Sequence, residues 1–169
     1  MEDIIKQKVV IDIDTAPNWD NVSSGICVVA NQDIIILLNF NEESGEFDGF
    51  SIFKNTDFEK YRIWNKEDYV EIKNNNSYEI LEKTKFDDFL DLETSLKKLK
   101  PELISIYTYD DENSFYVGRI LSVNKDSVEI RLVDKESKWT DIEIIELNEI
   151  SCIGFSSSYE MKLAKTLSN

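Results

Sequence analysis

Short runs in which apolar and polar residues alternate recur along the chain, and this spacing is typical of β-strands. In residues 127–133, Val128 and Ile130 point to one side of the predicted strand, while Glu129 and Arg131 point to the other. This is the pattern of a strand with one buried face. The runs are separated by short polar turns. We therefore predict a mainly β protein.

The two halves of the chain repeat one series of features at a separation of 93 residues. Eight of the 31 residues from 25 to 55 recur 93 positions later, which indicates a duplicated antiparallel meander. We expect Gly25 and Gly118 to hold equivalent positions, because glycine inside a strand marks a bend or a close backbone approach. The identical pairs are Gly25 and Gly118, Asn31 and Asn124, Asp33 and Asp126, Glu43 and Glu136, Ser44 and Ser137, Asp48 and Asp141, Ile52 and Ile145, and Asn55 and Asn148.

Few helices are predicted. The first covers residues 84–100, with Thr84 as its N-cap, lysines in its last turn and Pro101 directly after it. The second, near the C-terminus, runs from Ser158 to Leu167. Its inward side chains are expected to be Met161, Ala164 and Leu167, with Leu163 as an alternative.

The predicted fold is mainly β with few helices. It consists of two strongly bent, antiparallel, five-stranded meander units, residues 1–80 and 102–169, joined by a bridging helix within residues 81–101. In residues 141–147 the apolar positions change parity, which predicts a bulge near Ile144. Units of this kind resemble Sm-like or SH3-like barrels in architecture. Two separate domains and one larger split sheet both agree with the pattern.

The charge of the chain narrows the class of partner. Its 169 residues include 34 Asp and Glu against 19 Lys and Arg, a formal net charge of -15, and the acids are spread over both halves. Such a surface repels nucleic acid and anionic membranes and attracts cationic proteins. No signal-peptide pattern or membrane-length apolar run is present in the sequence, which predicts a cytoplasmic protein.

The sequence offers no set of residues typical of a catalytic or metal site. Histidine is absent, which removes the commonest general base and metal ligand. Cys27 and Cys152 lie in apolar runs and are predicted to be small buried hydrophobes. Asp12-Ile13-Asp14-Thr15 resembles an aspartate-based phosphatase motif, but its Thr is one position early, so an exposed strand face is predicted. We predict no enzyme activity, no catalytic residues, no metal and no cofactor.

In its overall character the chain resembles bacterial immunity proteins of toxin systems, including contact-dependent growth inhibition. The shared features are distributed acidity, modest size and the absence of a catalytic motif. The resemblance implies a partner that is a basic toxin domain such as a nuclease, whose active site the chain would occlude. Two alternatives remain: a non-enzymatic Sm-like or SH3-like adaptor of a bacterial assembly, and a carboxylate-based hydrolase.

The predicted partner-binding residues combine loop acids with aromatic side chains. Acids in loops are free to meet a partner, whereas strand acids compete with sheet packing. Tyr107 or Tyr109 is the predicted central anchor, because buried aromatic residues dominate many interfaces. The predicted acids are Glu42, Glu43, Glu46, Asp110, Asp111 and Glu112.

Overall fold

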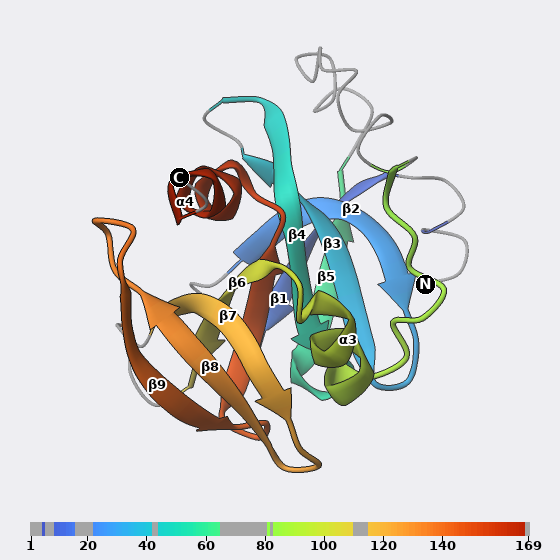
Figure 1. Cartoon of the computed structure of the whole chain (residues 1–169). Helices are drawn as coiled ribbons and strands as arrows, with labels where there is room; N and C mark the ends of the chain where they lie inside the picture. Colours follow the sequence, from blue (N-terminus) through green and yellow to red (C-terminus); the bar gives the residue numbers. More distant parts are fainter. Residues whose placement is uncertain are drawn as a thin grey trace. The chain divides into compact units, whose positions relative to one another are not determined.

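The computed structural model describes residues 5, 9–15, 22–41, 44–64, 81, 83–109 and 115–167. This part of the chain is mainly β, with ten strands and two α-helices (Figure 1), which confirms the predicted fold class. None of its helices has the length and apolar character needed to cross a membrane.

The chain divides into two compact units, residues 1–87 (unit 1) and 88–169 (unit 2). The unit 1 elements are β1 (Val10–Thr15), β2 (Val22–Ala30), β3 (Ile34–Asn41), β4 (Glu46–Lys54), the 3-10 turn η1 (Asn55–Asp57) and β5 (Phe58–Ile63). The unit 2 elements are α3 (Leu92–Leu99), β6 (Leu103–Thr108), β7 (Phe115–Val123), β8 (Ser127–Val133), β9 (Trp139–Glu146), β10 (Ile150–Phe155) and α4 (Ser158–Leu167).

Both units have the same strand order. In unit 1 it is β5-β1-β2-β3-β4, and in unit 2 it is β10-β6-β7-β8-β9. All these neighbours are antiparallel. In each unit the fifth strand therefore returns to pair with the first. No pairing of the two outer strands of either unit is present among the described residues, so the strands of neither unit close into a barrel.

The strand registers confirm that Gly25 and Gly118 are equivalent. Gly25 pairs with Ile11 of β1, and Gly118 pairs with Ile104 of β6, the residue 93 positions after Ile11. Two residues after each glycine the register shifts, between Cys27 and Val29 in β2 and between Ile120 and Ser122 in β7. The two halves thus share their bulge position as well as their strand order.

The separation of 93 changes to 92 from β4 onward. Residues 42–45 lie between the paired Asn41 and Glu46, whereas three residues, 135–137, lie between Asp134 and Lys138, which are joined by a backbone hydrogen bond. Because unit 2 has the shorter loop, Ile52 corresponds to Ile144. The predicted pairs Asp48 with Asp141, Ile52 with Ile145 and Asn55 with Asn148 are therefore wrong, although the duplication itself holds.

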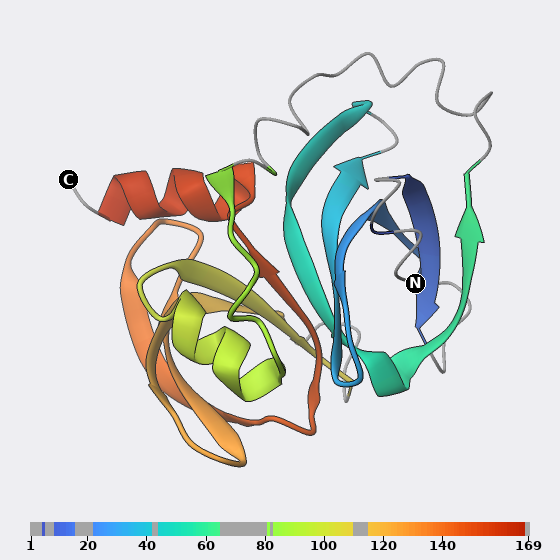
Figure 2. The ribbon, with the colours of Figure 1, turned by 90° about the vertical axis from the view of Figure 1, so that its right-hand side faces the viewer.

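Helix α3 is shorter than predicted. It begins at Leu92, and its N-cap is Asp91, whose backbone is extended at φ -148° and ψ -178°. The Asp91 side chain accepts a hydrogen bond from the Thr94 backbone N–H at 2.7 Å, and the Thr94 hydroxyl accepts one from the Asp91 backbone N–H at 3.1 Å. This capping box, rather than Thr84, starts the helix. Figure 2 shows α3 seated in the bend of the unit 2 strands.

Helix α4 has the predicted bounds, and most of its predicted inward side chains are confirmed. Leu163, the predicted alternative, is 7% exposed and belongs to a cluster with Leu103, Val117 and Val133, against which Ala164 and Leu167 pack. Met161, predicted to face inward, is 50% exposed.

The predicted bulge of β9 is not at Ile144 but a few residues earlier, where the register shifts between Ile142 and Trp139. The register between β8 and β9 runs without a break from Ser127 opposite Glu146 to Arg131 opposite Ile142. Ile145 is therefore the inward residue, and Ile142 and Ile144 lie on the exposed face.

Asp12 is buried, so the predicted exposed strand face is wrong at this position. Its carboxylate accepts hydrogen bonds from Ser24 Oγ at 2.7 Å and Trp64 Nε1 at 2.6 Å. Arg62 donates two more, from Nε at 2.9 Å and from Nη2 at 2.6 Å. Because these donors lie on β2, β5 and the residue after β5, Asp12 holds both neighbours of β1 in place.

Replacing either glycine by alanine is expected to destabilise the protein. A Cβ at Gly25 would lie 2.3 Å from the Leu38 carbonyl oxygen, and one at Gly118 would lie 2.1 Å from that of Arg131. The backbones would have to separate, at a cost of about 3 kcal/mol. Urea unfolding of Gly25→Ala and Gly118→Ala measures this. Thr140→Ala, at an exposed strand position, is the control, and equal stability of all variants would contradict the close approach.

Asp12→Asn is expected to lower the free energy of unfolding by about 2 kcal/mol, because buried donors lose their charged acceptor. The cost is less than that of breaking a fully buried ion pair, because the Arg62 side chain is 78% exposed. Asp14→Asn is the control, since Asp14 has a salt bridge of 3.8 Å to the exposed Lys60 and should change little. Urea unfolding at neutral pH compares the two variants. A free energy of unfolding for Asp12→Asn that is no lower than that of Asp14→Asn would contradict the role given to the Asp12 hydrogen bonds.

Candidate functional site

The N-terminal end of α4 is attached to β6 by a buried carboxylate. Glu160 is only 5% exposed and accepts a hydrogen bond from the Ser157 backbone N–H at 2.8 Å. The hydroxyl groups of Ser157 and Ser105 also donate to Glu160. Ser105 lies in β6, so these contacts fix where α4 begins on the sheet. The pattern of Ser followed three residues later by Glu is a helix N-terminal motif that could have been found in the sequence.

Next to this attachment, three aromatic rings from different elements are in contact, and we call Tyr107, Phe115 and Tyr159 the aromatic surface. Tyr107 of β6 pairs in register with Phe115 of β7, and their ring centroids are 4.9 Å apart. Tyr159 of α4 lies 6.2 Å from Phe115. Contacts of this length and tilt are favourable for aromatic pairs.

The aromatic surface is open to solvent. Tyr107, Phe115 and Tyr159 are 44%, 42% and 45% exposed, and Tyr109 is 42% exposed. A contiguous exposed apolar cluster usually marks a place where another molecule binds. Tyr and Phe are also enriched in the centres of protein interfaces. These rings can therefore supply apolar contact area to another molecule.

The Tyr107 hydroxyl is held in its neutral form. Burial is the main reason that the pKa of Tyr107 is raised above its ordinary value of 10.0. Repulsion from Cys152, Glu160 and Tyr159 in their ionised forms raises this pKa further. A tyrosine with the ordinary pKa is also neutral at neutral pH, so the shift in the pKa of Tyr107 matters only above pH 10.

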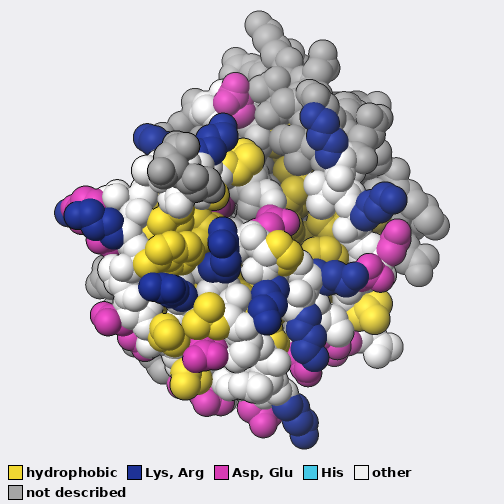
Figure 3. All heavy atoms as spheres, viewed as in Figure 1, with side chains coloured by type: hydrophobic (Ala, Val, Ile, Leu, Met, Phe, Trp, Pro, Cys, Tyr) yellow, Lys and Arg dark blue, Asp and Glu magenta, His cyan; other side chains and the backbone are white. Residues whose placement is uncertain are grey.

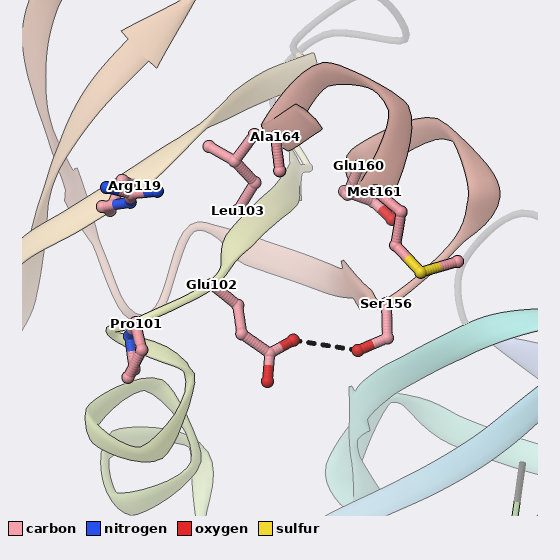
Figure 4. Close-up of a pocket in the computed structure, with 8 residues that line it drawn as sticks. All are labelled: Pro101, Glu102, Leu103, Arg119, Ser156, Glu160, Met161 and Ala164. Carbon is pink, nitrogen blue, oxygen red and sulfur yellow. Dashed lines mark hydrogen bonds between the residues drawn. The ribbon is translucent and has the colours of Figure 1, made fainter. Parts of the chain in front are cut away.

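A pocket in unit 2 adjoins the start of α4 (Figure 4). Its volume is about 240 Å³, below the roughly 300–1,000 Å³ of most small-molecule sites. Glu102 accepts a hydrogen bond of 2.9 Å from Ser156 on one wall. A cavity of this size suits one side chain of a partner. The lining residues are Pro101, Glu102, Leu103, Arg119, Ser156, Glu160, Met161 and Ala164.

The surface is not uniformly acidic. On the face shown in Figure 3, Lys and Arg side chains lie among hydrophobic and acidic ones. In unit 2 the guanidinium groups of Arg119 and Arg131 each lie 5.5 Å from the centre of the Trp139 ring. These cation–π contacts engage both arginines within the protein.

The structure places only some of the predicted binding residues. Tyr107 and Tyr109 are exposed in unit 2 as expected, and Glu46 is exposed at the start of β4 in unit 1. The other predicted acids lie outside the described residues: Glu42, Glu43, Asp110, Asp111 and Glu112. Phe115 and Tyr159, which contribute to the aromatic surface, were not among the predicted binding residues.

Comparisons with protein-family models, curated proteins and solved structures found no match to this chain.

The raised pKa of Tyr107 predicts a pH dependence of stability. The unfolded chain ionises this tyrosine from pH 10 upward, whereas the folded state keeps it neutral to higher pH. The stabilisation is therefore complete below pH 10 and is lost as pH rises through the folded pKa. Urea unfolding at neutral pH and above pH 10 should show a steeper loss for the wild type than for Tyr107→Phe. Tyr61→Phe, which removes an exposed hydroxyl from unit 1, is the control, and identical pH profiles for the wild type and Tyr107→Phe would contradict the prediction.

Proposed function

We propose that this chain is a bacterial immunity protein, acting in the cytoplasm without enzyme activity of its own. It binds a basic toxin domain such as a nuclease and occludes the toxin's active site. The aromatic surface of unit 2 anchors the toxin, and the acids in residues 110–114 and on the remaining surface attract it.

The observation that carries this proposal is the exposed contact of Tyr107, Phe115 and Tyr159. Residues 110–114 contain three acids and are bounded in the sequence by two exposed rings, Tyr109 and Phe115. An apolar centre with charges around it is the usual division of an interface into hot spot and rim.

The net charge of -15 supports a cationic partner. Opposite charges raise the association rate and have less effect on dissociation. An inhibitor that must reach a nuclease before the nuclease reaches nucleic acid gains from fast association. The same acids disfavour direct binding of the chain to phosphate backbones.

An adaptor of a bacterial assembly is the second candidate. It is favoured by the duplication, because two units with one strand order can present two similar binding surfaces. The two candidates differ in the partner, so co-expression separates them: an immunity protein protects cells from the toxin domain encoded immediately upstream of its gene, and an adaptor does not.

Binding kinetics with an inactive form of that upstream toxin domain test the division of roles. Phe115→Ala should raise the dissociation rate about tenfold or more, because a hot-spot ring is lost. Asp110→Lys and Glu112→Lys should instead slow association a few-fold at low salt and weaken its dependence on salt.

Tyr61→Ala is the matched control, because it removes a ring of similar exposure, 44%, from unit 1. An association rate that does not respond to salt would remove the electrostatic support for the proposal. Unchanged dissociation of Phe115→Ala would show that the aromatic surface is not the anchor. If no toxin domain is encoded next to this chain, the immunity function is wrong.

A further inference from the structure

The outer strand of the unit 2 sheet exposes isoleucines instead of burying them. β9 is the last strand in the order and pairs only with β8 among the strands of unit 2. Ile142 is 53% and Ile144 is 67% exposed. Exposed outer strands with apolar side chains are places where another chain can add a strand. The bulge of β9 lies before Ile142, so residues 142–146 keep a regular register.

Unit 1 contains the equivalent strand, β4, in which the corresponding apolar side chains are buried. The register makes Ile142 equivalent to Phe50 and Ile144 equivalent to Ile52 of β4. Phe50 is 1% and Ile52 is 0% exposed, and Phe86 packs on Phe50 with ring centroids 5.1 Å apart. The same apolar positions are therefore buried in unit 1 and open in unit 2.

The charges of β9 indicate which chain would cover it. In the regular part of the strand, Ile142 and Ile144 lie on the exposed face, whereas Glu143 lies on the other face beside the inward Ile145. An added strand that alternates Lys or Arg with apolar residues meets both faces favourably. A second copy of β9 would bring Asp141, Glu143 and Glu146 of both copies close together, and this repulsion between like charges disfavours it.

We propose that β9 binds an extended segment of a partner protein, in which basic and apolar residues alternate, as an additional strand of the unit 2 sheet. Backbone hydrogen bonds supply part of the affinity, and the alternating side chains supply the specificity. This inference is independent of the proposed immunity function, because it rests on β9 and not on the aromatic surface.

The probe is a blocked peptide of about seven residues in which Lys and Val alternate, the length of a typical strand. It is titrated into the full ¹⁵N-labelled chain and followed by amide chemical shifts. The largest shifts are expected in β9 and the facing residues of β8. The double variant Ile142→Thr and Ile144→Thr should weaken binding about tenfold while keeping strand propensity, and Glu143→Lys should also weaken it.

Two peptides and one variant serve as controls. A peptide of the same composition with its valines grouped tests the alternation, and one N-methylated at alternate residues tests the backbone hydrogen bonds. The double variant Tyr61→Thr and Ile63→Thr tests the outer strand β5, whose apolar residues, 44% and 47% exposed, alternate with Lys60 and Arg62.

This variant should bind the probe like the wild type, and both control peptides should bind weakly. Equal binding of either control peptide, shifts centred on the aromatic surface, or no binding at millimolar peptide would overturn the proposal. None of these results would decide the immunity function, which is tested by protection from the toxin domain.

Discussion

The fold of each unit depends on one close approach between backbones. At Gly25 and at Gly118 the second strand lies so near the carbonyl oxygen of the third strand that a Cβ would be only 2.3 Å or 2.1 Å from it. This lets the second strand bend sharply, and the bulge two residues later increases its twist. A bent second strand allows five strands to curve around one apolar core, as a flat sheet of that size cannot. The fifth strand can then return to pair with the first.

A second shared constraint is the polar position on the first strand. Asp12 of β1 and Ser105 of β6 are 93 residues apart and both are buried, at 7% and 1% exposure. In unit 1 the first strand supplies the acceptor, the Asp12 carboxylate, and the donor is Trp64, which follows β5. In unit 2 the first strand supplies the donor, the Ser105 hydroxyl, and the acceptor is Glu160, which follows β10. The two halves have therefore kept a polar contact between the first strand and the segment after the fifth, while exchanging donor and acceptor.

The parts of the fold that were predictable depend on local patterns. Helix α4 and the glycine equivalence were visible because helical spacing, caps and glycine in a strand act over a few residues. The start of α3 was predicted too early because Phe86 and Phe89 continue the apolar spacing of the helix upstream. The helix in fact begins at Leu92, after the capping box formed by Asp91 and Thr94. Of the aromatic surface, only Tyr107 was predicted from the sequence. Phe115 lies opposite Tyr107 on the neighbouring strand β7, but Tyr159 joins it through α4, and no local pattern states where a helix will pack.

The two properties of the proposed interface have different physical ranges, and this explains why one chain has both. The net charge acts over about a Debye length, roughly 8 Å at physiological ionic strength, so the acids need not contact the partner to attract it. The aromatic surface acts only at contact, where Tyr107 and Phe115 already touch and lose little freedom when a partner covers them. The rings are therefore preorganised by β6 and β7. Acids that attract over this distance, together with an aromatic centre whose rings are already in contact, would bring a cationic partner close quickly and still release it slowly.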